Sequence, residues 1–186
     1  MIIYGINPVL EAPKTGRVRE VRVDGAVRER VREVRAAAEA RRVPVRLVAA
    51  QDLDRAARGG VHQGVVAELA AAPGYSVQDL IASAQGPPLV VVLDGIEDPH
   101  NVGAMLRTVD AAGAHGLVRQ ERHAARLDGA AAKASAGALA HVKVATVVNI
   151  SRAIGELKDA GVWAVGLAGE ARETYDQIDF TQPTAL

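Results

Sequence analysis

A dense group of polar side chains follows the apolar run at residues 88–93. The group reads DGIEDPHN at 94–101, and Arg107 comes six residues after Asn101. The apolar run is typical of a buried strand, and the residues after Asn101 have helical spacing. Because ligands of open α/β sheets bind beyond the carboxyl ends of the strands, this junction is a candidate site for chemistry.

The helix predicted at 101–113 would turn Arg107 away from the core. Val102, Leu106 and Val109 share one apolar stripe. At 100° per residue, Arg107 lies about 140° from Val102 and within about 20° of His100. The side chain is therefore expected on the face that His100 occupies, where a guanidinium can bind phosphate with two hydrogen bonds.

A purely structural interpretation of these residues stays open. Asp98, ahead of Pro99, or Asn101 would cap the helix. Arg107 would then pair with Asp110 at i+3 on a solvated face, an interaction worth only a few tenths of a kcal/mol.

Several familiar kinds of site are excluded because their patterns are missing. The chain contains no G-x-G-x-x-G, no P-loop, no H-E-x-x-H and no G-x-S-x-G. It has no cysteine, and its five histidines lack metal-ligand spacing, so we expect no metal. No apolar run approaches the ~20 residues that span a bilayer, and no leader opens the sequence. We therefore expect a soluble cytoplasmic protein without a membrane partner.

The net charge of zero hides an asymmetry. Residues 1–70 carry 13 Lys and Arg against 9 Asp and Glu, a net charge of +4, and residues 71–186 carry the opposite, −4. Of the 22 cationic residues, 18 are arginine, which suits phosphate contacts better than lysine. A GC-rich genome explains the same arginine and alanine content, so composition alone does not decide for a nucleic-acid ligand.

The periodicity predicts two α/β domains. Residues 1–70 form a small one, residues 71–88 a linker with Pro and Gly at both ends, and residues 89–186 a second domain. In the second, strands alternate with helices, which favours a parallel sheet covered on both faces. The predicted strands are 18–23, 45–48, 65–67, 89–93, 116–118, 142–147, 162–167 and 184–186, the last as the start of a strand that ends this sequence at Leu186; the predicted helices are 26–40, 52–58, 101–113, 130–140 and 151–160, the last capped by Ser151.

The pattern L-D-x-I-x-D-P-x-N-V-G-A-x-L-R-T, at residues 93–108, resembles motif 1 of the SpoU-type RNA ribose 2′-O-methyltransferases of the SPOUT class. This resemblance covers the whole chain and implies a SPOUT-type (α/β knot family) domain behind a small N-terminal α/β RNA-binding domain. Further segments that are similar to the family are IYGINPVLE at 3–11, VHQGV at 61–65, KASAGA at 133–138 and DFTQP at 179–183.

The resemblance implies methyl transfer from S-adenosylmethionine to a ribose 2′-hydroxyl, of ribosomal RNA in preference to tRNA. It implies that Arg107 contacts the RNA phosphate and activates the hydroxyl, and that Asn101 holds the loop and the ribose. Because an arginine stays protonated, we favour electrostatic activation over proton abstraction, although the sequence leaves both open.

The same resemblance assigns RNA contacts to the N-terminal domain, at Tyr4, Asn7, His62, Gln63 and Gly64. A local interpretation weighs equally for these residues. Asn7 would start a helix with Pro8, and the His62–Gly64 segment would form a turn into the strand at Val65.

Members of the family continue past the strand at 184–186 into motifs 2 and 3, which supply most of the cofactor pocket and the knot. Of the cofactor contacts, the resemblance places only Gly166, Leu167 and Ala168 in this sequence, and the remainder would lie beyond Leu186. We therefore expect a domain truncated before the knot, with weak S-adenosylmethionine binding and no methyl transfer by this chain alone, although the complete protein would be the enzyme. The alternative function is a non-catalytic RNA-binding remnant. The family also implies a homodimer for the complete protein. Because the knot region contributes to that interface, we expect a weakened dimer or a monomer for this chain.

Overall fold

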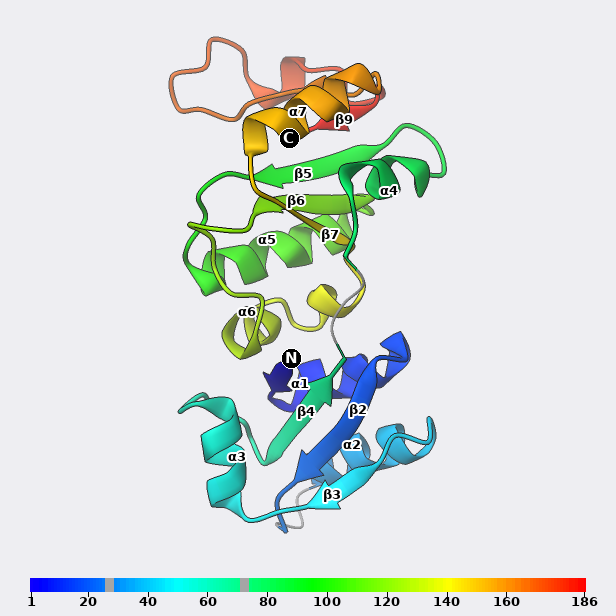
Figure 1. The fold of residues 1–186 in the computed structure, drawn as a ribbon, viewed down its shortest axis with the longest axis vertical. Coiled ribbons are helices and arrows are strands. Elements are labelled where there is room, and N and C mark those ends of the chain that lie inside the picture. The colour runs from blue at the N-terminus through cyan, green and yellow to red at the C-terminus, as the bar shows by residue number, and fades with distance from the viewer. Residues whose placement is uncertain (26–28, 71–73) are drawn as a thin grey trace. The chain divides into compact units, whose positions relative to one another are not determined.

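The computed structural model describes residues 1–25, 29–70 and 74–186 (Figure 1). The chain forms two compact units, of which the first comprises residues 1–73, 98–107 and 125–141 and the second comprises residues 74–97, 108–124 and 142–186. Residues 26–28 of the predicted helix 26–40 and residues 71–73 of the predicted linker 71–88 lie outside the described residues.

The first unit contains a mixed four-stranded sheet with the strand order β1-β4-β2-β3. Strand β4 runs antiparallel to both of its neighbours, and β2 runs parallel to β3. Strand β1 was not predicted, and helix α1 appeared only in the local interpretation, as a helix that Asn7 and Pro8 start. The elements are β1 (Ile2–Tyr4), α1 (Ile6–Glu11), the 3-10 turn η1 (Ala12–Thr15), β2 (Val18–Val23), α2 (Glu29–Glu39), β3 (Val45–Leu47), α3 (Ala50–Ala57), β4 (Val65–Leu69), α6 (Gly129–Ala134) and η2 (Ala138–Ala140).

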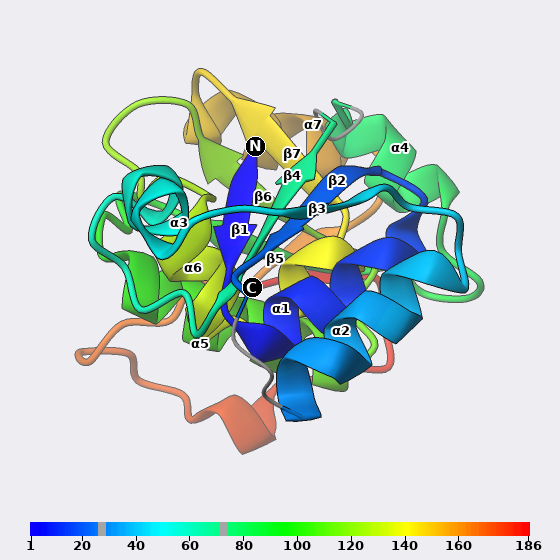
Figure 2. The same ribbon diagram turned by 90° about the horizontal axis from the view of Figure 1, so that it is seen from below.

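Helices cover both faces of this sheet. Figure 2 shows α1 and α2 on one face and α3 on the other. The apolar stripe of α2, Val31, Val34 and Ala38, is buried against Val21 and Val23 of β2, as its spacing predicted. Alternation along β2 leaves Arg22 on the opposite face, where it binds Glu20 and Glu68 at 2.6 and 2.8 Å.

The second unit is built on a five-stranded sheet in which every described pairing is parallel, in the order β7-β6-β5-β9-β8. This confirms the predicted α/β class and parallel sheet. Helix α5 (Pro99–Ala111) begins in the first unit and ends in the second. The remaining elements are α4 (Val77–Ala82), β5 (Leu89–Leu93), β6 (Gly116–Gln120), β7 (Val144–Val147), α7 (Ile150–Asp159), β8 (Trp163–Ala164), η3 (Tyr175–Gln177) and β9 (Thr184–Ala185).

The predicted strand at 184–186 is present as β9 (Thr184–Ala185). Strand β9 ends at Ala185, so Leu186 lies outside the assigned strand. Leu186 nevertheless continues the pairing with β5. Its N–H donates to the Val90 carbonyl at 2.9 Å, and its carbonyl accepts from the Val92 N–H at 2.6 Å. Leu186 therefore extends the parallel pairing along one edge of β5.

The core of the second unit joins helices α4 and α7 to the sheet. Leu80 of α4 and Leu157 of α7 are fully buried with Val90, Val118 and Ala145 of the strands. Helix α4 lies within residues 71–88, so part of the predicted linker is core structure.

Polar side chains set the ends of the helices. Ser76 and Asp79 form a capping box at α4, and these hydrogen bonds hold the pKa of Asp79 below its usual value. Helix α7 is capped by Asn149, whose Oδ1 accepts from the Arg152 backbone N–H at 2.9 Å. The predicted cap, Ser151, was wrong, because the helix begins one residue before it at Ile150.

Gly103 lets α5 approach α6 closely. A Cβ added at this position would lie 2.3 Å from the Ala134 Cβ and 2.9 Å from the Ala131 carbonyl oxygen. The neighbouring atoms include backbone, which cannot yield as a flexible side chain does. The glycine of the N-V-G-A segment is therefore required for packing.

We expect Gly103→Ala to lower the free energy of unfolding by about 1–3 kcal/mol, the usual cost of overpacking. Gly155→Ala is the matched control, since Gly155 is also helical, in α7, and a Cβ there meets nothing within 4 Å. The control should gain up to ~1 kcal/mol because alanine favours the helix. Denaturant unfolding measures the change in the free energy of unfolding of both variants. An unchanged free energy for Gly103→Ala would contradict the close approach of α5 and α6.

Candidate active site

The polar segment after β5 is organised by Asp98. The His100 backbone N–H donates to Asp98 Oδ1 at 2.9 Å, and the Val102 N–H donates to the Asp98 carbonyl at 3.1 Å. Pro99 occupies the first helical position, where its missing N–H costs nothing. Of the two predicted caps, Asp98 is therefore the one used. Asn101 stands inside the first turn with an exposed side chain.

Arg107 lies exposed in the third turn of α5. The alternative pairing with Asp110 is not formed, and among the described residues the Arg107 side chain has no hydrogen bond or ion pair. Other arginines at the same spacing do pair, as Arg30 does with Glu33 at 2.8 Å. The guanidinium of Arg107 is thus available to an external anion.

Asn101 and Arg107 do not share a face of α5. Six positions separate them, which corresponds to about 120° around the helix and about 9 Å along it. His100, seven positions before Arg107, is on nearly the same face. An elongated ligand lying across the helix would be needed to contact Asn101 and Arg107 together.

The His62–Gly64 segment is fixed by its own hydrogen bonds. The Gly64 N–H donates to His62 Nδ1 at 3.0 Å, so the ring proton is on Nε2, which donates to Asp54 Oδ1 at 3.0 Å. Gln63 Oε1 accepts from the Ile6 N–H at 3.0 Å. Both Gln63 and Gly64 have positive φ angles, 56° and 85°. The predicted local turn into β4 is therefore present.

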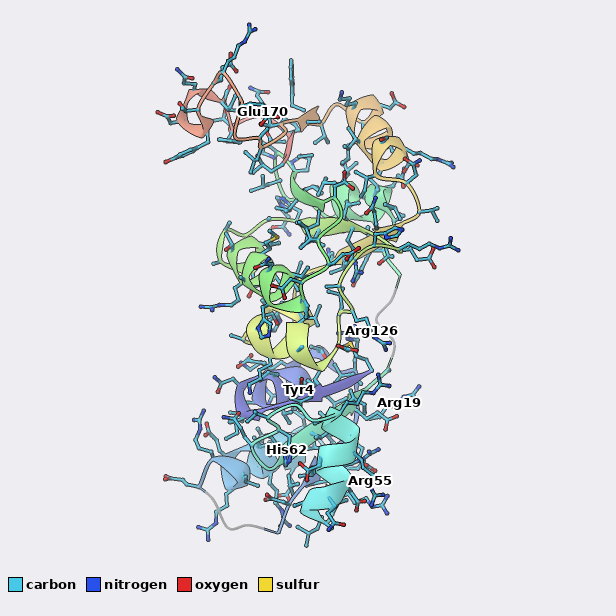
Figure 3. All side chains as sticks on the ribbon, turned by 90° about the vertical axis from the view of Figure 1, so that its left-hand side faces the viewer. Tyr4, Arg19, Arg55, His62, Arg126 and Glu170 are labelled. Carbon is cyan, nitrogen blue, oxygen red and sulfur yellow. The ribbon has the colours of Figure 1, made fainter. Side chains whose placement is uncertain are left out.

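Tyr4 is half-buried between two glycines (Figure 3). A Cβ at Gly60 would lie 2.3 Å from the ring Cζ, and one at Gly129 would lie 1.8 Å from Cε1. Burial, with the nearby Asp128 carboxylate second, raises the pKa of Tyr4. The ring is consequently a packed wall of the first unit.

Asn7 has its carbonyl oxygen occupied. Its Oδ1 accepts from Arg30 Nη2 at 3.0 Å. The amide NH2 of Asn7, like that of Gln63, keeps its donors. The structure therefore brings Tyr4, His62, Gln63 and Gly64 into one local arrangement, while Asn7 stands apart on α1 with an exposed side chain.

The loop after β8 forms a hollow of about 840 Å³ in the second unit. Gly166, Leu167 and Ala168 line it, together with the Tyr175 region of η3. Leu167 and Tyr175 are largely exposed, and a Cβ at Gly166 would meet nothing within 4 Å. Glu170 lies in the same loop and is exposed (Figure 3). The hollow thus combines apolar side chains with open backbone.

Leu186 does not line this hollow. Both of its backbone hydrogen-bonding groups are engaged with β5, at Val90 and Val92, so they are not offered to a ligand. The prediction that further cofactor contacts follow Leu186 concerns residues outside this sequence and stays a prediction.

Two family matches cover nearly the whole chain. The SpoU rRNA Methylase family matches residues 88–186, and the RNA 2′-O ribose methyltransferase substrate binding family matches residues 2–74. The chain belongs to the SpoU family. This confirms the resemblance found in motif 1.

Similar proteins share both the sequence and the fold. The 23S rRNA (guanosine-2′-O-)-methyltransferase RlmB of Yersinia pestis is 37% identical over 190 residues, covering 100% of this chain and 77% of that protein. The RlmB of Pseudomonas putida is 36% identical, covering 99% and 76%. The SpoU methyltransferase AviRb from Streptomyces viridochromogenes matches with a TM-score of 0.79 at 26% identity, covering 100% of this chain and 70% of that one.

SpoU methyltransferases use S-adenosylmethionine, and an AdoMet-bound rRNA methyltransferase from Sinorhizobium meliloti matches this fold with a TM-score of 0.74 at 25% identity, covering 99% of this chain and 68% of that one. The hollow at Gly166, Leu167 and Ala168 fits such a group, because an adenosyl moiety needs apolar walls and a few polar contacts. Within the described part of the chain, no three His, Asp or Glu side chains are grouped to hold a metal ion, and no helix is long and apolar enough to cross a membrane.

Arg119 is a residue that sequence reasoning missed. It is only 9% exposed in β6, and its Nε donates to the Gln120 carbonyl at 3.2 Å. It has no ion pair among the described residues, and burial lowers the pKa of its guanidinium. The predicted strand 116–118 stopped one residue short of this arginine, whereas β6 continues to Gln120 and so includes it.

We expect Arg119→Leu to raise the melting temperature by about 2–4 °C, because it removes a buried cation that lacks a carboxylate partner. The exposed Arg122→Leu is the control and should leave the melting temperature unchanged. Thermal unfolding measures both. A lower melting temperature for Arg119→Leu would mean that the bond to the Gln120 carbonyl outweighs the desolvation of the charge.

Proposed function

We propose that this protein transfers a methyl group from S-adenosylmethionine to a ribose 2′-hydroxyl of 23S ribosomal RNA. The observation that carries the proposal is Arg107, which is exposed and has no hydrogen bond or ion pair among the described residues. It lies in motif 1, on the helix that Asp98 caps. Family membership supplies the reaction class, and the named activity of the RlmB relatives supports the RNA and the ribose oxygen.

Arg107 acts on the nucleophile by electrostatics. A 2′-hydroxyl attacks poorly until negative charge on its oxygen is stabilised as the proton leaves. The Arg107 guanidinium stays protonated, so it supplies positive charge and fixed N–H donors instead of accepting the proton. Bound to the adjacent phosphate, it also orients the ribose.

Asn101 and the loop after β8 complete the assignment. The Asn101 amide can donate to and accept from the ribose hydroxyls across the helix from Arg107. S-adenosylmethionine, when bound, supplies an electrophilic methyl group. Gly166, Leu167 and Ala168 would hold it by backbone contacts and by the apolar wall at Leu167.

In the N-terminal part, Tyr4, Asn7, His62, Gln63 and Gly64 are proposed to serve RNA binding in two ways. His62 and Gly64 fix the turn by their hydrogen bonds, and Tyr4 packs against Gly60, two residues before the turn. In Asn7 and Gln63 the amide oxygen accepts an intrachain hydrogen bond, whereas the amide NH2 group keeps its donors for the RNA.

We expect Arg107→Ala to slow methyl transfer by about 10²–10³, as removal of a transition-state donor does. The measurement is incorporation of label from S-adenosylmethionine into a 23S rRNA transcript, with protein that also carries motifs 2 and 3. Arg107→Lys should not restore the rate, because an ammonium cannot reproduce the planar fork. Both variants should melt within a few degrees of the parent, since Arg107 is exposed.

Arg152→Ala is the control for lost surface charge. Arg152 is an exposed helical arginine whose ion pair with Glu156, at 3.5 Å, is weak. It should leave the transfer rate unchanged. If Arg107→Ala methylated as fast as this control, Arg107 would have no part in the reaction.

We also propose that the protein acts in the cytoplasm, where ribosomal RNA is modified, and as a homodimer. Largely exposed apolar side chains in the second unit, Trp163, Leu167 and Tyr175, support an association surface there. Sedimentation velocity at micromolar concentration should show the dimer. A monomer under those conditions would contradict this part of the proposal.

A further inference from the structure

An arginine-lined hollow of about 780 Å³ lies within the first unit, separate from Asn101 and Arg107. Its walls come from β1, β2, the end of α3 and the segment that leads into α6 (Figure 3). Four arginines and a single carboxylate are among the lining residues, which gives the hollow a surplus of positive charge. The charged lining residues are Arg22, Arg55, Arg58, Arg126 and Asp128.

Arg58 is the lining arginine without a partner. Its side chain is exposed and has no hydrogen bond or ion pair among the described residues. Its backbone ends α3 in the left-handed region, with φ 50° and ψ 46°. A non-glycine residue is strained in that conformation, and glycine is the residue usually found there. Because strain of this kind clusters at functional positions, Arg58 is a candidate ligand-binding residue.

The other three lining arginines have acid partners. Arg22 is held firmly, whereas Arg55 and Arg126 form exposed ion pairs. Arg22 is anchored by Glu20 and Glu68, so it contributes a fixed rim. Arg55 pairs with Asp52 at 3.5 Å and Arg126 with Asp128 at 2.9 Å, and both arginine side chains are about three-quarters exposed, at 77% and 75%.

Such exposed ion pairs contribute little to stability, and a phosphate can replace the carboxylate in a charge-assisted hydrogen bond. Arg55 and Arg126 can therefore turn to a bound anion at small cost. The remaining wall includes the Tyr4 ring and the apolar Ala56, Ala57 and Leu127, which can lie against a sugar or a base.

We propose that this hollow binds the phosphate backbone of the RNA substrate, with Arg58 and Arg55 as the principal phosphate ligands and Arg126 closing the opposite wall. The proposal rests on the proposed function, because RNA is the substrate of that reaction. The volume of the hollow lies in the range of sites for small organic ligands. It is enough to admit part of one nucleotide beside the Tyr4 ring and the apolar lining residues. RNA is held here and methylated elsewhere.

The test is RNA binding by the double variant Arg55→Ala/Arg58→Gly, measured with a 23S rRNA transcript in the absence of S-adenosylmethionine. Glycine at position 58 relieves the left-handed backbone, so the melting temperature should stay the same or rise. We expect affinity to fall about tenfold to a hundredfold, as for lost hydrogen bonds to a charged group. The slope of log K against log salt should decrease in magnitude by about 1.5.

The charge-matched control is Arg32→Ala/Arg41→Ala. Both residues are exposed in the first unit, have no ion pair among the described residues and lie outside the hollow. This control should change affinity by less than about threefold, as expected for surface charges away from the ligand. Equal losses in the two double variants would overturn the hollow as an RNA site, because only net charge would then matter.

Two further outcomes separate the alternatives. Calorimetry with inorganic pyrophosphate tests a site for free phosphates, and micromolar binding together with unchanged rRNA affinity in the variant would overturn the proposal. If the parent protein failed to bind the transcript at all, the proposed function would fail with it. If the parent bound and methylated but the variant did so equally well, the hollow alone would be refuted.

Discussion

Strand β5 is hydrogen-bonded along both edges, to β6 and to β9, and this pairing decides where the reactive residues can stand. Val90 faces Gly116 on one side and Ala185 on the other, and it is fully buried. A strand enclosed in this way carries no polar side chain until it leaves the sheet. The polar segment therefore begins at Asp94, after the last paired residue, Leu93, and four residues later Asp98 sets the start of α5.

A second constraint is the close approach of chain segments at small residues. Gly103 admits the backbone of α6, and Gly60 and Gly129 admit the Tyr4 ring. Gly103 therefore has a packing role within the motif 1 pattern, although it carries no reactive group. Gly129 and Gly103 belong to the first unit, so both help to fix the surroundings of the predicted RNA-binding residues.

Elements with a complete apolar pattern were predictable from sequence. The strands at 18–23 and 89–93 have the predicted bounds, since alternation marks one and an unbroken apolar run marks the other. Strand β1 was missed because three residues are too few to show a period, and for the same reason the six residues of α1 were marked only by the Asn7-Pro8 start signal. The predicted helix 130–140 is interrupted after Ala134, where Ala136 and Gly137 take positive φ angles that local propensity does not reveal.

The site residues also include features that the sequence predicted and features that it did not. Motif 1 placed Arg107 off the core, because helical geometry alone determines that face. The absence of its pairing with Asp110 could not be predicted, since an i+3 pair of this kind is nearly neutral and tertiary surroundings decide it. The arginine-lined hollow was equally hidden, because its walls come from segments more than a hundred residues apart in sequence.

The charge of the first 70 residues shows why such sites are invisible to composition. Arg22, Arg30 and Arg35 each bind a glutamate, so much of the arginine content is neutralised locally. The surplus of +4 is carried by arginines that have no acid partner among the described residues, and of these Arg58 lines the hollow. Net charge measures the attraction of RNA to the whole molecule, which acts at long range and weakens with salt. The place where the RNA binds depends instead on which arginine side chains line a hollow and have no acid partner. Arg58, at the left-handed end of α3, stands in such a place. Arg107 is exposed on α5 and likewise has no hydrogen bond or ion pair among the described residues.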